Sequence, residues 1–451
     1  MAFNIHQKLR DNIAAIRIAL EWEQGKTLSE ADITALQRYC GFGGIKAVLF
    51  PDAPKEEWIK LGASETDLRL HEDIQDFHRL LKSYLPDTAC KEVVQSIKNS
   101  VLTAFYTPAF VPRTLYRVLQ EKSVEPQHLY EPSSGAGIFI TESVKAFPGL
   151  QSVTAVEKDI LTGKIMQAIG STLPVPALVH RKGFEQTPVS DDGKYDLIAS
   201  NIPFGNFSVY DPDFPDKAIS GKIHNYFFAK GLDKIADGGI LAYITTDAFL
   251  NNPSNRQARE WLFARADFVS LAVLPDNLMK DTGNTEAPSH LLVVQKNEFK
   301  QGLSETEHEL VATVQKENEF GVFSLNQYIE LHPEVIAADT VRAGKNQYGQ
   351  AHTEIWQQGE LEKTGERIAA LLSEGFGSRF SPQAFQNTQL SVGITNAGTK
   401  KQLSFLPVPE NKNDNSQVQL GLFEQRFLLK LRIQNPNDVE LPINGLNFEI
   451  E

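Results

Sequence analysis

Residues 194 to 205 read Lys194-Tyr-Asp-Leu-Ile-Ala-Ser-Asn-Ile-Pro-Phe-Gly205. An apolar run ends abruptly at Asn201, Ile202, Pro203 and Phe204. This pattern predicts a buried parallel strand that delivers an amide, a rigid turn and an aromatic ring to the carboxyl edge of a sheet. Open α/β sheets bind their ligands at that edge. The stretch therefore predicts an α/β fold and the place of the functional site.

The same four residues suit a reaction at the exocyclic amine of adenine, which is a poor nucleophile because its lone pair is delocalised into the ring. The side-chain oxygen of Asn201 and the carbonyl of Ile202 could each accept one amine hydrogen, while Phe204 stacks on a base taken out of the duplex. Pro203 would make the turn rigid. We take these four as candidate catalytic residues, with an ordinary strand-to-loop turn as the alternative.

The composition is ordinary for a soluble globular protein, with 41% hydrophobic residues in a chain of 451. Only Cys40 and Cys90 are present, which excludes a cysteine zinc cluster or a disulfide framework and favours a reducing compartment. No run reaches membrane-spanning length, so we expect a cytoplasmic protein without a metal or a membrane partner. A net charge of −13 argues against a generally basic nucleic-acid surface but allows a local basic cleft.

Texture along the sequence predicts four regions. They are a helical region over 1–98, an alternation of strands and helices over 99–297, a weaker pattern over 298–395, and a polar, partly disordered tail over 396–451. Helices are expected over 5–23 and over 355–372, and another is expected to begin at a capping box at Ser29. The glycines from Gly375 are expected to end the helix over 355–372.

A glycine-rich turn follows the first predicted strand of the second region. Gly135 and Gly137 allow the backbone close to a ligand, and Glu157, at the end of the next strand, is placed to bind ribose hydroxyls. Phe184 could pack on an adenine whose edge is recognised by Glu185. A dinucleotide fold would offer a similar turn, but Ile140 stands where its third glycine would fall.

Several of these stretches resemble motifs of the amino-group DNA methyltransferases. Asn201-Ile-Pro-Phe204 resembles motif IV, Glu131-Pro-Ser-Ser-Gly-Ala-Gly137 motif I, and Ala104-Phe-Tyr-Thr-Pro108 motif X, in the order of the gamma class. The resemblance implies a Rossmann-like methyltransferase fold, with an N-terminal helical region and a C-terminal extension, that uses S-adenosyl-L-methionine. The cofactor-binding residues it implies are Tyr106, Thr107, Pro108, Glu131, Pro132, Ser133, Gly135, Gly137, Glu157, Phe184, Glu185 and Asn201.

Over residues 5 to 297 the chain is similar to the methylase part of phage and mobile-element adenine methyltransferases, some of which are fused to helicases and act in antirestriction. Further stretches that carry this similarity are Tyr39-Cys-Gly-Phe-Gly-Gly-Ile45, Ile223-His-Asn-Tyr-Phe-Phe-Ala-Lys230 and Asp237-Gly-Gly-Ile-Leu-Ala-Tyr-Ile-Thr-Thr246. Phe42 and Ile202 depart from the usual Trp and Pro or Val. The resemblance implies an N6-adenine methyltransferase of the restriction-modification type with DNA as partner, and residues 298–395 as the place of target recognition.

Two further groups are candidates for binding. Phe204, His224, Asn225 and Tyr226 are expected to line the base pocket, although a histidine on an apolar helix is more often a packing residue. In the tail, Gln419, Leu420, Leu422 and Phe423 resemble the short peptide by which bacterial DNA-handling proteins bind the sliding clamp. The alternative for the tail is the start of a strand.

Two other functions stay open at this stage. Glutamine-methylating enzymes use a similar turn on a side-chain amide, and a catalytically silent DNA- or clamp-binding accessory protein would also fit the departure at Ile202.

Overall fold

The computed structural model describes residues 4–101, 106–283, 285–346, 349–388, 418–421 and 428–431. The chain forms two compact units, Met1–Thr399 and Lys400–Glu451. In the second unit, β12 (Val418–Gly421) pairs antiparallel with β13 (Leu428–Leu431). Gln419 and Leu420 lie in β12, whereas Leu422 and Phe423 lie outside the described residues, as do Ala104, Phe105 and the segment 396–416.

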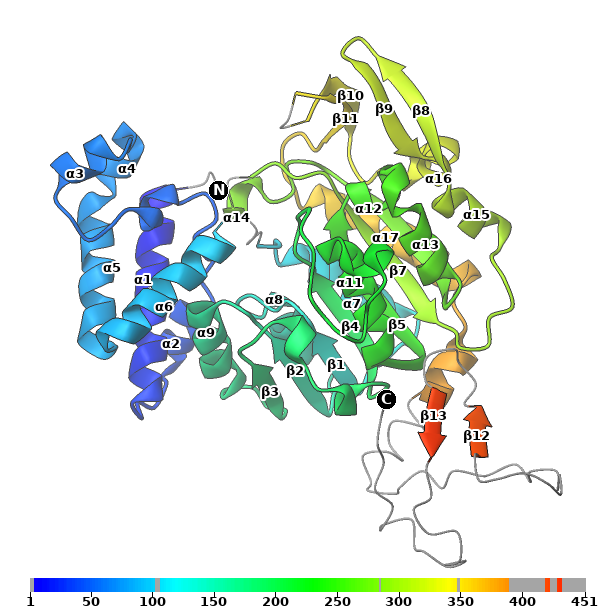
Figure 1. Ribbon diagram of the computed structural model, residues 1–451, viewed down its shortest axis with the longest axis horizontal. Helices are drawn as coiled ribbons and strands as arrows, with labels where there is room; N and C mark the ends of the chain where they lie inside the picture. Colours follow the sequence, from blue (N-terminus) through cyan, green and yellow to red (C-terminus); the bar gives the residue numbers. More distant parts are fainter. Residues whose placement is uncertain are drawn as a thin grey trace, which may run out of the picture. The chain divides into compact units, whose positions relative to one another are not determined.

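The first unit is built on a seven-stranded sheet in the order β3-β2-β1-β4-β5-β7-β6 (Figure 1). Its strands are β1 (His128–Glu131), β2 (Ser152–Val156), β3 (Ala177–His180), β4 (Tyr195–Asn201), β5 (Ile235–Thr246), β6 (Ala266–Leu274) and β7 (Ser289–Lys296). The pairings among β1 to β5 are parallel, and β7 runs antiparallel to both β5 and β6. The predicted α/β, Rossmann-like fold is confirmed.

Helices cover both faces of this sheet. The longer ones are α7 (Phe110–Glu121), α8 (Ile138–Ala146), α9 (Ile160–Gly170), α11 (Ile223–Lys234), α13 (Arg256–Phe263) and α17 (Lys363–Ser378), with short α10 (Lys217–Ser220), α12 (Ala248–Asn251) and α14 (Lys280–Gly283) between them. One apolar core joins α11 and α13 to one face, and another joins α7, α8 and α17 to the opposite face. None of the described helices is long and apolar enough to cross a membrane.

The strand predicted from the opening stretch is β4, and it is buried on both sides. Leu197 and Ala199 belong to one core and Ile198 to the other. Since a central parallel strand has no solvent-facing side, its sequence is continuously apolar instead of alternating. Asn201, the last residue of β4, is the first to reach the edge of the sheet.

The N-terminal helices lie beside α9 (Figure 1), and side chains of these helices and of α9 form a third core. They are α1 (Ile5–Glu23), α2 (Glu30–Leu36), α3 (Lys55–Lys60), α4 (Glu65–Arg69), α5 (His71–Tyr84) and α6 (Asp87–Ser100). The predicted bounds of α1 are confirmed, and Ser29 caps α2 through a capping box with Asp32. Because α9 contributes Leu161 and Ile165 to this core, the helical region is packed directly on the sheet domain.

The region after residue 297 differs from expectation. It contains α15 (Glu305–Val311), the hairpin of β8 (Thr313–Asn318) and β9 (Gly321–Asn326), α16 (Gln327–Leu331), and the hairpin of β10 (Thr340–Lys345) and β11 (Ala351–Trp356). The prediction of a helix over 355–372 was wrong at both ends, because Ile355 lies in β11 and α17 continues through Gly375. A Cβ at Gly375 would collide with the carbonyl oxygen of Val269, so this glycine serves close packing of α17 on β6 and does not end the helix.

Arg259 anchors α15 to the sheet domain through buried hydrogen bonds. Its guanidinium is fully buried and donates to the carbonyl oxygens of Val311 (2.8 and 3.1 Å), Phe249 (2.9 Å) and Asn252 (2.9 Å). The Val311 carbonyl, at the end of α15, receives two of these bonds.

We predict that Arg259→Met lowers the free energy of unfolding by about 3–5 kcal/mol, because the buried carbonyls of Val311 and Phe249 lose their donors. The matched control is Arg256→Ala, an exposed residue of the same helix whose loss should change the value by no more than about 0.5 kcal/mol. Urea denaturation of the two variants measures the difference, and equal losses would contradict the role of Arg259.

Candidate active site

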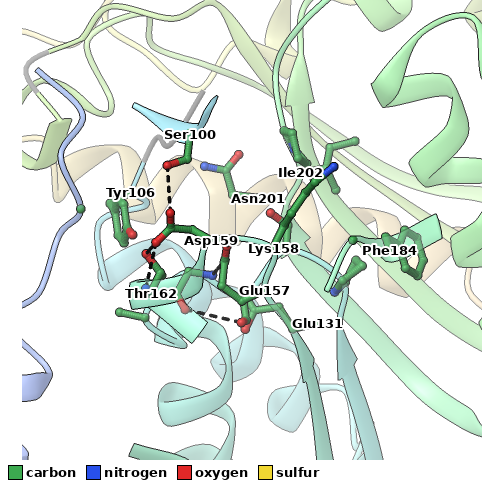
Figure 2. A pocket seen from close by; sticks show the side chains of 18 of the residues that line it. Ser100, Tyr106, Glu131, Glu157, Lys158, Asp159, Thr162, Phe184, Asn201 and Ile202 are labelled. Carbon is green, nitrogen blue, oxygen red and sulfur yellow. Dashed lines mark hydrogen bonds between the residues drawn. The ribbon is translucent and has the colours of Figure 1, made fainter. Parts of the chain in front are cut away.

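A cavity of about 1520 Å³ opens at the carboxyl edge of the sheet. Adjacent strands bring its central residues together, since Glu131 ends β1, Glu157 follows β2 and Asn201 ends β4 (Figure 2). The N-terminal helices contribute Lys8, Gln95, Ser96 and Asn99 to the lining. The cavity therefore belongs to both the sheet domain and the helical region.

Most of the residues predicted for the site line this one cavity. They are Tyr106, Thr107, Glu131, Pro132, Ser133, Gly135, Glu157, Phe184, Glu185, Asn201, Ile202 and Pro203. Pro108, Gly137, Phe204, His224, Asn225 and Tyr226 are not among its lining residues.

The glycine-rich turn between β1 and α8 has the backbone that the sequence requires. Gly135 and Gly137 have φ angles of 52° and 78°, a region that favours glycine. The ring of Tyr106 lies against Gly135, where an added Cβ would come within 3.3 Å of the ring. A Cβ at Gly137 would collide with Met166. One glycine thus admits an aromatic ring beside the cavity and the other admits the packing of α9.

Two carboxylates face the cavity from neighbouring strands. Glu157 accepts hydrogen bonds from the backbone N–H groups of Gly135 (2.8 Å) and Asp159 (2.7 Å), and these bonds fix its orientation. Burial, reinforced by the negative charge of Asp159, raises the pKa of Glu157 to about 7. Burial, with the charge of Glu157 next in importance, raises the pKa of Glu131 well above its usual value.

Glu131 carries the clearest sign of an interaction with a ligand. It is 1% exposed, and its Oε2 accepts no hydrogen bond from any of the described residues. A buried carboxylate oxygen without a donor is costly, and it favours a ligand that brings hydroxyl or ammonium hydrogens. Two acidic groups beside the turn disfavour the pyrophosphate of a dinucleotide, because like charges would meet there.

Asp159 connects this pair to the helical region, although sequence reasoning did not select it. Its Oδ1 accepts from the backbone and hydroxyl of Thr162 (2.9 and 2.8 Å), and its Oδ2 accepts from Ser96 of α6 (2.7 Å) and Ser100 (3.3 Å) (Figure 2). The only local signal is that an aspartate precedes the apolar run of a helix and can cap it. Nothing local indicates the contact with α6.

The glycine segment that begins at Tyr39 encloses Tyr106. Asn12 of α1, fully buried, donates to the Gly41 carbonyl (2.6 Å) and accepts from the Cys40 N–H (3.0 Å). A Cβ at Gly41 would collide with the ring of Tyr106, and Tyr39 packs edge-on against the same ring at 6.1 Å. The N-terminal helices therefore hold the aromatic ring that covers the Gly135 turn.

Ile202 is fixed in the turn by a main-chain bond. Its N–H donates to the carbonyl of Ile244 (3.0 Å), which extends the pairing of β4 with β5 by one residue. Proline has no N–H and could not make this bond. The departure from the usual Pro at this position thus exchanges ring rigidity for a hydrogen bond, and Pro203 follows it in the lining. Phe204 is half-buried against the neighbouring apolar core.

The three residues predicted beside the base on α11 have internal partners. His224 receives a hydrogen bond from Asn255 (3.2 Å), and burial lowers the pKa of His224 to about 4, so the ring is neutral. Asn225 donates to the carbonyl of Ala218 (2.9 Å), and the Tyr226 hydroxyl donates to Asp211 (2.5 Å). These contacts hold the segment after Phe204, and a role at the base stays a prediction.

Comparison with known proteins found no matching family model and no matching curated protein. Among solved structures, a candidate class I S-adenosylmethionine-dependent methyltransferase of Listeria monocytogenes is 13% identical, over 66% of this chain and 91% of that one, with a TM-score of 0.40. The methyltransferase subunit of a type I restriction-modification system from Streptococcus thermophilus is 15% identical, over 84% and 82%, with a TM-score of 0.38. The M protein of the type I restriction enzyme EcoKI is 11% identical, over 89% and 94%, with a TM-score of 0.38.

The lining residues fit S-adenosylmethionine. A ribose diol can donate to Glu157, which is oriented by two backbone N–H groups, and Glu131 offers a buried acceptor to a cationic or hydroxyl-bearing group. Phe184 and Glu185 line the cavity as well, and Phe184 is 2% exposed. Both an apolar surface for an adenine ring and acceptors for its ribose are therefore present in one cavity.

The raised pKa of Glu157 predicts a pH dependence of stability in the protein without ligand. Because the folded-state pKa of about 7 exceeds the ordinary value of 4.5, the folded chain binds this proton more tightly than the unfolded chain. The resulting stabilisation is full below about pH 4.5 and is lost as the pH rises through about 7, by up to about 3 kcal/mol.

We expect Glu157→Gln to lack this loss, so that its free energy of unfolding relative to the wild type improves from pH 5 to pH 8. The exposed Glu56→Gln serves as the control and should follow the wild type. Parallel pH-dependent curves for wild type and Glu157→Gln would show that Glu157 titrates normally.

Proposed function

We propose that this protein is an S-adenosylmethionine-dependent methyltransferase that methylates N6 of adenine in DNA. The observation that carries the proposal is that the Asn201-Ile202-Pro203 turn opens into the same cavity as Glu131 and Glu157. Amide and carbonyl acceptors for an amine thus share one space with acceptors for a ribose. Methyl transfer to an amino group needs both.

On the acceptor side, the chain positions the amine. Asn201 ends β4, whose pairing with β5 fixes it, and the Ile202 main chain is held by Ile244. Oxygen acceptors on Asn201 and Ile202 would take the two amine hydrogens, which draws the nitrogen lone pair out of conjugation with the ring and directs it toward the methyl donor. The cofactor would supply a methyl group whose bond to sulfur breaks, with the electron pair kept by sulfur, as the amine nitrogen bonds to it, and the amine proton would leave to solvent.

On the donor side, the cofactor supplies an electrophilic methyl group on a cationic sulfur. Glu157 would hold the ribose and thereby the direction of the sulfur, while Glu131 would stabilise positive charge through its buried oxygen. Tyr106, fixed by Tyr39 and Gly41, would exclude water over the glycine turn. Positioning then supplies most of the rate.

Basic residues in the lining of the cavity favour DNA as the substrate in spite of the acidic net charge. They are Lys8, Arg38, Lys145, Lys158 and Lys182, of which Lys145 and Lys158 also pair with Glu142 and Glu185. Such side chains suit phosphate contacts, which would make binding salt-dependent. Target selection would lie in residues 298–395, where β11 pairs with the loop after β6 through Ile355 and Asp276 (2.7 and 3.1 Å). A role in restriction-modification or in a mobile element would follow from the choice of target.

We expect Asn201→Ala to abolish methyl transfer while the dissociation constant for S-adenosylmethionine stays within a few-fold of the wild type. The side chain accepts hydrogens of the substrate and not of the cofactor's ribose, so its loss acts on the transfer step. Labelled methyl transfer to unmethylated genomic DNA, followed by nucleoside mass spectrometry, measures the first quantity, and calorimetry the second.

The control is Glu56→Gln, at an exposed residue distant in the sequence from Asn201. It should keep both methyl transfer and the affinity for S-adenosylmethionine. A collapse of cofactor binding in Asn201→Ala would reject its place at the base. Methyl transfer to a protein glutamine would favour the protein-acceptor alternative, and cofactor binding without any product would favour a silent accessory protein.

Binding of the tail to the sliding clamp is a separate proposal that rests on Gln419, Leu420, Leu422 and Phe423. A short apolar peptide can bind by burying a few large side chains. Deletion of residues 419–423 should remove binding to purified clamp and leave methylation of short oligonucleotides intact. Clamp binding that persists after the deletion would reject this peptide as the contact.

A further inference from the structure

The segment after Phe204 presents two exposed aromatic rings at the rim of the cavity. Phe207 is 46% exposed and Tyr210 is 85% exposed. Of the large apolar side chains exposed in the described part of the chain, these two are the ones that line the cavity. Exposed aromatic rings beside a ligand cavity can stack on a planar ligand.

The backbone between and around these rings is held in place. The Val209 N–H donates to the Ser220 carbonyl (2.8 Å), and Asp211 accepts from Lys230 (2.7 Å) and Tyr226 (2.5 Å). Asp211 and Lys230 form an ion pair whose side chains are 2% and 5% exposed. A buried pair of this kind fixes position more than it adds stability, so the exposure of Tyr210 is imposed by the fold.

The same lysine shows which end of the cavity the segment faces. Lys230 Nζ also donates to the Glu185 carbonyl (3.3 Å) and lies 5.9 Å from the centre of the Phe184 ring. Asp211 and Glu185 therefore share one anchoring group. Through Asp211, the 207–212 segment therefore reaches the Phe184–Glu185 surface.

We propose that residues 207–212 form the outer wall of the site for the cofactor's adenine, with the rings of Tyr210 and Phe207 covering a purine whose inner side faces Phe184. This inference rests on the proposed function, since it takes the Glu157 cavity to bind S-adenosylmethionine. It adds two binding residues and assigns a positioning role to the Asp211–Lys230 pair. Purine stacking is the chemistry, and the cofactor is its source.

The cavity is large enough to hold more than one ligand. Its volume of about 1520 Å³ exceeds the roughly 300–1,000 Å³ of a typical small-molecule site, so one ligand does not fill it. A purine between Phe184 and Tyr210 would bury part of the Tyr210 ring and separate the adenine end from solvent. The remaining space, toward Asn201, is left for the acceptor.

The test is calorimetric binding of S-adenosylmethionine and of adenosine to the full chain. We expect Tyr210→Ala to weaken both by roughly tenfold, the usual scale for loss of one aromatic stacking partner. Tyr210→Phe keeps the ring and should restore binding to within about threefold of the wild type. Phe299→Ala is the matched control, because Phe299 is 78% exposed and does not line the cavity.

Each outcome separates the inference from the function on which it rests. Unchanged cofactor binding in Tyr210→Ala overturns the inference, and if binding of an oligonucleotide is weakened instead, the stacked purine comes from DNA. Failure of Tyr210→Phe to restore binding also overturns it, since stacking is then not the cause. A wild-type chain that binds neither ligand overturns the proposed function itself, whatever the variants do.

Discussion

Two acidic side chains, the buried Glu131 and the partly exposed Glu157, lie at the carboxyl ends of adjacent strands, and the rest of the site follows from this constraint. Burial of like charges is unfavourable unless donors surround them, and the chain supplies some through Gly135 and Asp159 while Glu131 Oε2 is left for a ligand. The positive φ of Gly135 lets its N–H reach Glu157 and lets Tyr106 approach. These carboxylates therefore destabilise the site without ligand, and a ligand with hydroxyl or cationic groups can offset that cost by pairing with them.

The helical region takes part in this arrangement instead of standing beside it. Ser96 of α6 binds Asp159, which neighbours Glu157, and Asn12 of α1 holds the glycine segment around Tyr106. The loop after β6 closes the same side, because Thr282 donates to the Tyr106 carbonyl and accepts from Lys8 (3.4 Å). Three stretches that are far apart in the sequence thus hold the Tyr106 ring in place. We therefore assign its support to the first unit as a whole.

The sheet domain could be predicted because short stretches of sequence indicate its strands and turns. The contacts between the helical region and the sheet could not, because they depend on tertiary structure. The apolar run before Asn201 and the glycine turn at Gly135 can each be recognised within a dozen residues, and both lie where expected. The prediction that Gly375 ends a helix was wrong, because this glycine allows α17 to approach Val269 closely, and no local sequence pattern shows that contact. No sequence pattern selected Tyr210, because an exposed tyrosine in a polar loop becomes a candidate only once the cavity beside it is known.

The central claim is that the carboxylate pair forms the cofactor site, and the affinity for S-adenosylmethionine as a function of pH tests it most directly. Glu157, with a pKa of about 7, must release its proton to accept hydroxyl hydrogens, so wild-type affinity should rise roughly tenfold from pH 6 to pH 8. Calorimetry in two buffers should show a proton released on binding near pH 7. In Glu157→Gln both the rise and the released proton should be smaller, because the Glu131 carboxyl is then the one of the pair left to titrate. No binding by the wild type, or the same pH dependence in the variant, would contradict the account.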